Sequence, residues 1–414
     1  MRIETLDLLR CPYCGGRLSL VDSLFHRRSG DELQDGILGC LCCIFPIVDG
    51  IPVLHLQPTA QTACDQVQAG HPDLARRSMF GLTGDGEAEA FEAVASSSAA
   101  TYRQVVEALG PNFEGRYFLY RFSDPTFVVA DAVVRTVGRT VLGGGARAID
   151  VCGGSGHLTR SLIALSPVPP VLADLYFAKV WLARRFTAPG CAPVCCDGNA
   201  PLPFARGAFT FAMCVDAFMF IWTKRQLVGE MTRLIDGRDA GTVLIGHTHN
   251  ERTWSPSHGQ PLTPEGYTGL FEALAPRAFG EAHLFEDVVG GGPLDLSRHD
   301  SREALDRDPA LTIIATRHPG VFARHALEGP MPARGEFRLN PLYAVEPDGS
   351  HVRLRLRFPS DDYEQEYGAC RRYLPDEAVI DRSDLDALPA ATLSGPLTDL
   401  ARRRVILDLP KRYY

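Results

Sequence analysis

From residue 146 onwards, short β-rich apolar runs alternate with stretches that have helical character. Short apolar runs bounded by Gly, Pro or Asp are typical of strands buried on both faces, and their alternation with helices predicts a parallel sheet. The chain is therefore expected to form an α/β fold over this region. The predicted strands are 148–151, 171–174, 193–196, 209–215, 242–247, 284–289 and 311–316.

Two segments before this region have the spacing of helices. Residues 101–110 and 127–141 place apolar side chains three and four positions apart, which puts them on one helical face. The segment between them, 117–125, is rich in aromatic residues and suits either the core or a lid over a substrate or cofactor. Residues 57–100 have little periodicity and are rich in Ala, Gly, Gln and Ser, which predicts a linker with short helical pieces.

The chain after about residue 320 has a different pattern. A Pro-Asp-Gly turn inside 342–358 predicts a hairpin. Arg353, Arg355 and Arg357 alternate with apolar residues, so the polar face of one strand is basic. A solvated strand face is the favoured interpretation of this stripe.

The sequence predicts neither a membrane span nor a secretory signal. Its most apolar stretch, 209–222, is shorter than the roughly 18 residues a membrane helix needs, and it contains Asp216. The first residues include charges and a cysteine motif in place of an apolar signal core. A cytoplasmic protein is therefore expected, and in a reducing compartment clustered cysteines indicate a metal site more often than disulfides.

Such a cluster lies in the first fifty residues. Cys11 and Cys14 form one C-x2-C knuckle, and Cys40 and Cys43 form a second, with 25 residues between the knuckles. Two such knuckles are a strong zinc signal, and four thiolates close the coordination sphere, so the ion would be structural. Cys42 is treated as a spare thiol because it breaks the spacing. The intervening segment is predicted to be a long hairpin.

The composition argues against a nucleic-acid partner. Lys plus Arg number 42 and Asp plus Glu number 50, a net charge of −8. Residues 1–54 carry five Arg and seven acids, and residues 319–414 carry 14 basic and 15 acidic residues. Neither end of the chain provides the basic surface that binding to a phosphate backbone requires.

The N-terminal segment resembles a known family. The sequences LRCPYC at 9–14 and CIFPIVDGIPVL at 43–54 are similar to the small zinc-ribbon activator subunits of tRNA and translation-factor methyltransferases. The resemblance covers about residues 1–56. Because that ribbon partners a methyltransferase in the family, the resemblance implies a catalytic partner on this same chain.

A glycine turn carries the candidate cofactor chemistry. The sequence DVCGGSG at 150–156 follows one predicted strand and precedes a helical stretch. A dinucleotide fingerprint would continue to Gly or Ala where this chain has Thr159. An acid at the entrance of the turn, Asp150, suits a ligand that carries an ammonium group, such as S-adenosylmethionine.

Further acids end the next two strands. The carboxylate of Asp174 suits ribose hydroxyls, because it can accept two hydrogen bonds. Asp197 suits the adenine amino group, with the apolar segment 202–204 as a wall. The carboxyl ends of parallel strands share one edge of a sheet, so these acids and the turn are expected to lie together.

Over about residues 127–318 the chain resembles the class I S-adenosylmethionine-dependent methyltransferases. The motifs DVCGGSG, ADLYF, CDGNAPLPF, FTFAMCVDAF and GEMTRLI carry the likeness. The resemblance implies a Rossmann-like seven-stranded sheet with a reversed last strand, and Asp150, Gly154 and Gly156 beside the methionine moiety. Cys152 departs from the Gly usual in the family. The predicted cofactor site comprises Asp150, Cys152, Gly153, Gly154, Gly156, Asp174, Leu175, Asp197 and Gly198.

Methyl transfer needs an aligned acceptor, exclusion of water and, for a protonated acceptor, a base. Asp216 ends the fourth predicted strand, and His247 and His249 end the fifth on one face. A neutral imidazole is a suitable proton acceptor near pH 7. These three residues are the catalytic candidates, with His247 first, and His258 and Tyr267 lie in a downstream segment that could close over a pocket.

The resulting hypothesis is an S-adenosylmethionine-dependent methyltransferase of a small molecule, plausibly a secondary metabolite. An rRNA or tRNA base methyltransferase and an inactive binding protein of this fold are the alternatives. The acceptor atom, the oligomeric state and transfer of another arm of the cofactor stay open. The expected organisation is a zinc ribbon at 1–56, a linker and helical lid at 57–126, the methyltransferase domain at 127–318 and a C-terminal α+β extension at 319–414.

Overall fold

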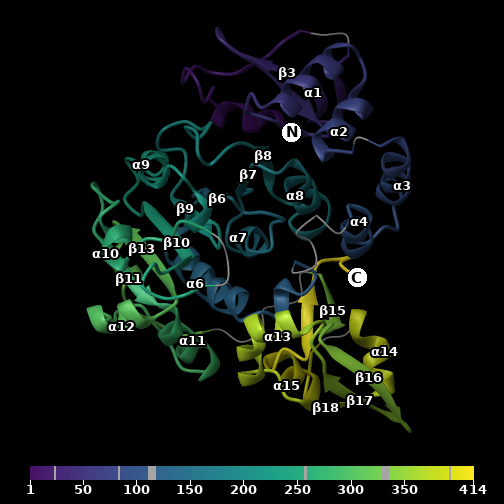
Figure 1. The fold of residues 1–414 in the computed structure, drawn as a ribbon, viewed down its shortest axis with the longest axis vertical. Helices are drawn as coiled ribbons and strands as arrows, with labels where there is room; N and C mark the ends of the chain where they lie inside the picture. The colour runs from purple at the N-terminus through teal and green to yellow at the C-terminus, as the bar shows by residue number, and fades with distance from the viewer. Residues whose placement is uncertain (23–24, 83, 111–117, 256–258, 328–334, 391–392) are drawn as a thin grey trace.

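A mixed sheet of seven strands lies at the centre of the molecule (Figure 1). The computed structural model describes residues 1–22, 25–82, 84–110, 118–255, 259–327, 335–390 and 393–414. The strands are β6 (Ala148–Val151), β7 (Val171–Asp174), β8 (Ala192–Cys195), β9 (Phe211–Val215), β10 (Thr242–His249), β11 (Pro276–Gly280) and β13 (Ala310–Thr316).

The strand order is β11-β13-β10-β9-β6-β7-β8. The last strand in sequence, β13, is antiparallel to both of its neighbours, β10 and β11, and the pairs from β10 to β8 are parallel. This arrangement confirms the expected Rossmann-like sheet with a reversed last strand.

One predicted strand is wrong. Residues 284–289 belong to a helix, α11 (Glu281–Val289). Leu284, Phe285 and Val288 recur at helical spacing, and Leu284 is fully buried. The strand that the sequence analysis missed is β11, because Pro276 and Gly280 at its ends are typical of turns and only two apolar residues separate them.

Side chains alternate between the two faces of the sheet. Leu172 faces one core cluster, and its neighbours Val171 and Ala173 face the other. The first cluster is covered by α6 (Pro125–Val141), α7 (Thr159–Leu165), α8 (Phe177–Leu182) and α11. The second is covered by α9 (Lys224–Leu234), α10 (Pro264–Thr268) and the N-terminal ribbon.

The ribbon extends the edge of this sheet. Val53 forms a parallel bridge with Cys195 of β8, and the Leu54 N–H donates to the Cys195 carbonyl at 2.7 Å. Pairing in this way covers the otherwise exposed edge strand. The ribbon's elements are a 3-10 helix (Ile3–Leu8), β1 (Ser19–Leu20), β2 (Arg27–Ser29), β3 (Glu32–Gly39), β4 (Ile44–Val48) and β5 (Ile51–Pro52). Antiparallel pairing of β2 with β3 bears out the predicted hairpin.

The segment predicted as a linker with short helical pieces is largely helical. Small side chains such as Ala60 and Ala63 on the first helix join the same core cluster as the central sheet, and so does Phe91 on the third. Burial of alanines gives little contrast in a hydrophobic pattern, which explains the weak periodicity. The helices are α1 (Pro58–Gln68), α2 (Pro72–Phe80), α3 (Asp85–Ala95) and α4 (Tyr102–Ala108).

The C-terminal residues build a separate core. The predicted hairpin is confirmed as β16 (Tyr343–Asp348) and β17 (His351–Leu356), and β18 (Glu377–Asp381) completes that sheet. Arg353 and Arg355 pair with acids on neighbouring strands, consistent with a solvated strand face. The remaining elements are β15 (Glu336–Leu339), α13 (Asp361–Tyr367), α14 (Arg382–Ala387), α15 (Pro396–Arg402) and β19 (Ile406–Leu409).

Two short strands and one helix complete the central region: β12 (Leu294–Asp295), α12 (Arg302–Arg307) and β14 (Arg324–His325). The end of the chain returns to the central core, where Tyr413 stacks on Tyr102 with ring centroids 4.6 Å apart. Within the described residues, no helix combines the length and apolarity needed to cross a membrane.

Candidate functional site

The strand order reverses beside β6, and α/β sheets have their ligand-binding crevice at such a reversal. The chain runs from β6 outward to β7 and β8, then crosses back to β9 on the other side of β6. Such a reversal separates the connections that leave the carboxyl ends of the two neighbouring strands, and ligands of α/β sheets bind there. The predicted site residues lie in or just after the carboxyl ends of β6, β7, β8, β9 and β10.

The glycine turn after β6 contains three residues with left-handed backbone: Cys152 at φ 59°, Gly154 at φ 56° and Gly156 at φ 77°. A side chain at Gly154 would meet no atom within 4 Å, so its backbone can be approached closely by a ligand. A Cβ at Gly156 would lie 2.8 Å from the Cβ of Ala183, so Gly156 allows close packing between the turn and the helix that follows β7. Cys152 adopts this left-handed backbone although it is not a glycine.

Asp150 lies beneath the turn and supports it. Its side chain is 2% exposed, and the Thr159 hydroxyl donates to its Oδ2 at 2.6 Å. A Cβ at Gly153 would come within 2.6 Å of this carboxylate. Burial raises the pKa of Asp150 to about 7, against the effect of the Thr159 hydrogen bond. A direct contact between Asp150 and an ammonium group stays a prediction.

Asp174 is oriented by two backbone donors. The Gly154 N–H donates to its Oδ2 at 3.0 Å, and the Tyr176 N–H donates to its Oδ1 at 2.9 Å. These two hydrogen bonds fix the orientation of the carboxylate, whose oxygens can each accept more than one hydrogen bond. The side chain of Tyr176 is 60% exposed beside this acid. Leu175 accepts a hydrogen bond at its carbonyl from the Cys195 thiol, which ties the loop after β7 to β8.

The loop after β8 closes against the turn. Asp197 Oδ1 accepts the Asn199 N–H at 2.8 Å, and Asn199 Oδ1 accepts the Trp222 N–H at 2.7 Å, so the loops after β8 and β9 are linked. A Cβ at Gly198 would lie 3.0 Å from the Cys152 sulfur. The structure thus brings Cys152, Asp174, Asp197 and Gly198 to one edge of the sheet.

The catalytic candidates at β9 and β10 belong to a partly buried ionic cluster. Glu281 Oε2 lies 2.6 Å from His247 Nδ1, and its Oε1 accepts both the His247 N–H and the Thr312 hydroxyl at 2.8 Å. Asp216 Oδ1 lies 4.0 Å from His247 Nε2. Asp216 and His247 both have left-handed backbone, with φ of 55° and 43°. Non-glycine residues in this region carry strain that the surrounding contacts must offset.

The pairing with Glu281 favours the protonated form of His247. Burial alone would lower its pKa, but Glu281 outweighs burial and raises the pKa of His247 to about 9. In turn, the imidazolium lowers the pKa of Glu281 although burial acts the other way. The pairing with Glu281 therefore disfavours the neutral imidazole expected of His247, and a role of His247 as base stays a prediction.

His249 has the opposite character. Burial and then the charge of His247 lower the pKa of His249, so it is neutral near pH 7. Its ring centroid lies 5.6 Å from that of His247, and its Nδ1 lies 3.1 Å from the Ser255 hydroxyl. Of the two histidines, His249 has the protonation state that a general base requires.

The aromatic segment before α6 covers this cluster. The Arg121 guanidinium lies 2.8 Å from Asp216 and 3.3 Å from Asp124. Phe122, Ser123 and Asp124 are buried. Burial raises the pKa of Asp124 although Arg121 opposes the shift. Residues 118–124 therefore lie over the end of β9, and Tyr117 falls outside the described residues.

Tyr267 has a structural position, since its hydroxyl donates to the His249 carbonyl at 2.7 Å and the residue is fully buried. His258 lies outside the described residues.

Four cysteines of the ribbon come together. The Sγ atoms of Cys11, Cys14, Cys40 and Cys42 all lie within 4.8 Å of one another. Three of these separations are 3.7 Å, 3.7 Å and 3.5 Å, close to the roughly 3.8 Å edge of a tetrahedron with Zn–S bonds of about 2.3 Å. The Cys42 N–H also donates to the Cys40 sulfur at 3.4 Å. The cluster fits a zinc ion.

The fourth thiol differs from the predicted Cys43. The Cys40 N–H donates to the Cys43 carbonyl at 3.0 Å and closes a tight turn with Cys42 at its tip. This turn directs Cys42 toward Cys11, while Cys43 is half-buried against the second core cluster. The x2 spacing could not reveal this, because Cys40 can share an ion with either neighbour.

The sequence analysis missed Glu281 and the ionic role of Arg121. Glu281 directly follows the unrecognised strand β11, so its place at the carboxyl edge was hidden. An acid directly after a strand and at the first position of a helix would have been the usable signal. Arg121 was included only as part of an aromatic run.

No protein-family model matches the chain, and no curated protein matches it. Solved structures resemble part of it. A Bacillus halodurans C-125 protein described as a methyltransferase is 16% identical, covering 45% of this chain and 98% of its own, with a TM-score of 0.31. Geranyl diphosphate C-methyltransferase from Streptomyces coelicolor A3(2) is 16% identical over 43% and 71%, with a TM-score of 0.33.

A third similar structure is a chain from the complex of the Haloferax volcanii Trm112 methyltransferase activator with a protein described as a methyltransferase. It is 15% identical, covers 45% of this chain and 89% of its own, and has a TM-score of 0.35. These similarities concern the fold of less than half of the chain.

Proposed function

We propose that the chain is an S-adenosylmethionine-dependent methyltransferase that acts on a small molecule. The observation that carries the proposal is the pairing of Asp174, at the end of β7, with Gly154 in the turn after β6, beside the point where the strand order reverses. An oriented carboxylate suits a pair of ribose hydroxyls, and an open glycine backbone suits the amino acid part of the same cofactor. Asp197 and Gly198 on the next loop would flank the adenine.

S-adenosylmethionine, when bound, supplies an electrophilic methyl group, so the protein's tasks are to align the acceptor, exclude water and manage a proton. His249 is the candidate base, because it is neutral and lies at the end of β10. The protonated His247 is held by Glu281 and Asp216 and would orient the acceptor by charge. This divides the two histidines into a base and a positioning residue.

The burial of this cluster supports a small acceptor. The side chains of His247, Asp216 and Glu281 are only 19%, 30% and 11% exposed. Arg121 in the segment 118–124 pairs with Asp216 and contributes to this burial. The negative net charge of the chain also disfavours a nucleic acid as the acceptor.

We further propose that the cysteine cluster holds a structural zinc ion through Cys11, Cys14, Cys40 and Cys42. Cys42→Ser should lower the zinc content of purified protein from about one ion per chain toward zero, whereas Cys43→Ser should retain it. Elemental analysis of both variants decides between the two sets of ligands. Retention of zinc by Cys42→Ser together with its loss from Cys43→Ser would contradict the structural set.

The catalytic proposal is tested by labelling. Purified protein is incubated with S-adenosylmethionine bearing a trideuterated methyl group and a small-molecule extract of the cells that carry the gene. Mass spectrometry should find a metabolite that gains one labelled methyl group with the wild type and with Asp362→Ala, an exposed control on α13. Asp174→Ala should abolish the label. Label in the RNA of a parallel incubation would overturn the small-molecule assignment, and no label in either fraction would overturn methyl transfer.

A further inference from the structure

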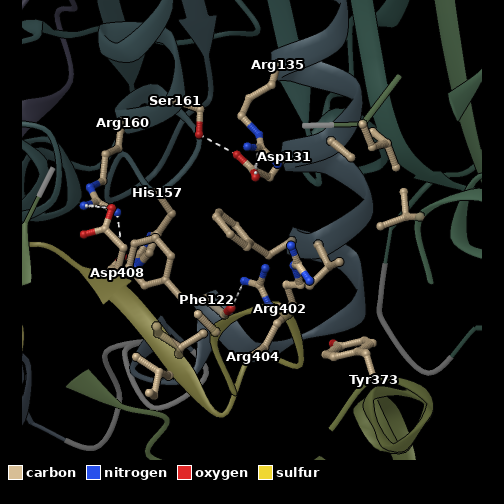
Figure 2. A pocket seen from close by; sticks show the side chains of 18 of the residues that line it. Phe122, Asp131, Arg135, His157, Arg160, Ser161, Tyr373, Arg402, Arg404 and Asp408 are labelled. Atoms are coloured by element: carbon tan, nitrogen blue, oxygen red, sulfur yellow. Dashed lines mark hydrogen bonds and ion pairs between the residues drawn. The ribbon is translucent and has the colours of Figure 1, made fainter. Parts of the chain in front are cut away.

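A cavity of about 600 Å³ lies between the central helices and the C-terminal residues (Figure 2). Its walls come from α6, α7 and α11 on one side and from β15, α15 and β19 on the other. The α6 residues that line it include Asp131 and Arg135, whereas Val129 and Val133 on the same helix pack into the core beneath the sheet. The cavity is therefore on the outer side of α6, and Asp150, Gly154, Asp174 and Asp197 are not among its lining residues.

The lining combines aromatic surface with positive charge. Phe122, Phe127, Phe337 and Tyr373 supply aromatic walls. Four arginines and two aspartates also line the cavity, and both aspartates are already paired. Arg160 lies 2.9 Å from Asp408, and Arg135 lies 3.0 Å from Asp131. The lining therefore has two arginines, Arg402 and Arg404, whose positive charges no acid of the lining balances.

Arg404 is the distinctive group. One of its Nη atoms donates to the Phe122 carbonyl at 2.5 Å, while its buried Nε has no hydrogen-bond partner. Among the described residues, no carboxylate lies within ion-pair distance of it. Burial lowers the pKa of Arg404, which expresses the cost of keeping this charge away from water. Arg404 is only partly exposed, and a shielded cation that pairs directly with no carboxylate is destabilising unless an anion meets it; the more distant Asp131 and Asp124 only partly offset this cost.

The backbone at Arg404 gives a second sign of specialisation. Its φ is 55°, and it follows Arg403, the C-cap of α15, at a position where glycine is the favoured residue. An arginine here accepts backbone strain in addition to the cost of burial. Figure 2 shows its guanidinium beside Phe122, with Tyr373 on the C-terminal side of the same cavity.

We propose that this cavity binds a small amphipathic anion, with a carboxylate or phosphate on Arg404 and an apolar body against Phe122, Phe127, Phe337 and Tyr373. The site is separate from the cofactor crevice and goes beyond the proposed methyl transfer. It also assigns a task to the C-terminal residues, because β15, α15 and β19 complete a pocket that the central helices leave open.

The test uses three probes that share one aromatic body: 2-naphthoate, 2-naphthyl phosphate and the uncharged 2-naphthalenemethanol. In isothermal titration of the full chain, at least one of the two anions should bind at least tenfold more tightly than the alcohol. The better anion identifies the head group that the site prefers. Equal affinity for all three, or no binding of any, would overturn the proposal.

Variants locate the binding. Arg404→Met keeps an apolar stem and should weaken binding of the preferred anion at least tenfold, while Arg403→Met, an exposed neighbour paired with Asp399 at 3.5 Å, should not change it. If Arg404→Met does not fold, Val289→Trp decides, because it fills the cavity from a half-buried wall position and should also weaken binding. Unchanged affinity in the variants that fold would overturn the site. Asp174→Ala should retain full affinity, which separates this test from that of the proposed function.

Discussion

The two halves of the sheet's carboxyl edge are built by different means. At β6 and β7, acids are held by backbone N–H groups and a hydroxyl from neighbouring loops, as Asp174 is by Gly154 and Tyr176. At β9 and β10, side chains hold one another, as Glu281 and Asp216 hold His247 on strained backbone. The first half is a preformed receptor that depends on chain geometry. The second is an electrostatic cluster whose protonation depends on its partners.

The largest expected effect is the loss of kcat when His249, the neutral histidine of the second half, is replaced. His249→Gln should lower kcat by about 10²–10⁴ with the acceptor found by labelling, if that acceptor loses a proton. Ser255→Ala, which removes a neighbour 3.1 Å away but keeps the imidazole, is the matched control and should change kcat far less. In the wild type, kcat should fall only below about pH 6.5, since the pKa of His249 is lowered. An unchanged kcat in His249→Gln would show that His249 is not the general base.

The second effect concerns the ion pair itself. Glu281→Gln leaves His247 buried without its strongest acid and should lower the free energy of unfolding at pH 7 by about 3 kcal/mol or more. The matched control is His351→Gln, which breaks a pair with Asp381 whose side chains are about half exposed (54% and 55%), and should cost about 0–1 kcal/mol. Urea denaturation of both variants measures the difference. Equal costs would show that burial does not strengthen the His247 pair.

The third prediction concerns how the contribution of His247 to stability changes with pH. The folded-state pKa of His247, about 9, lies above its unfolded value of 6.5, so its stabilisation is complete below pH 6.5 and is lost as pH rises through 9. The His247→Gln variant should be less stable than the wild type by about 3 kcal/mol at pH 6. The gap should close by about pH 10. A gap independent of pH from 6 to 10 would mean that His247 is neutral when folded.

The first half of the edge could be predicted from the sequence because its signals are local. Asp150 and Asp174 lie at strand ends and Gly154 lies in the turn that follows β6, and the strands themselves are clear apolar runs. The second half could not, because Glu281 is 34 positions from its partner His247 and follows a strand with only two apolar residues between its ends. The cysteine cluster of the ribbon could be predicted only in part. The cysteine spacing predicted the cluster, but the choice of Cys42 over Cys43 as the fourth thiol is a proposal that rests on the turn at 40–43.

The most direct test of the central claim is calorimetric titration of the full chain with S-adenosylmethionine. The wild type and the exposed control Asp362→Ala should bind one equivalent. Asp174→Ala removes both oriented carboxylate oxygens and should weaken binding by about 1–3 kcal/mol. The free energy of unfolding of this variant should be measured alongside to show that the crevice still forms. No binding by the wild type, or unchanged affinity in a folded Asp174→Ala variant, would contradict the assignment of this crevice as the cofactor site.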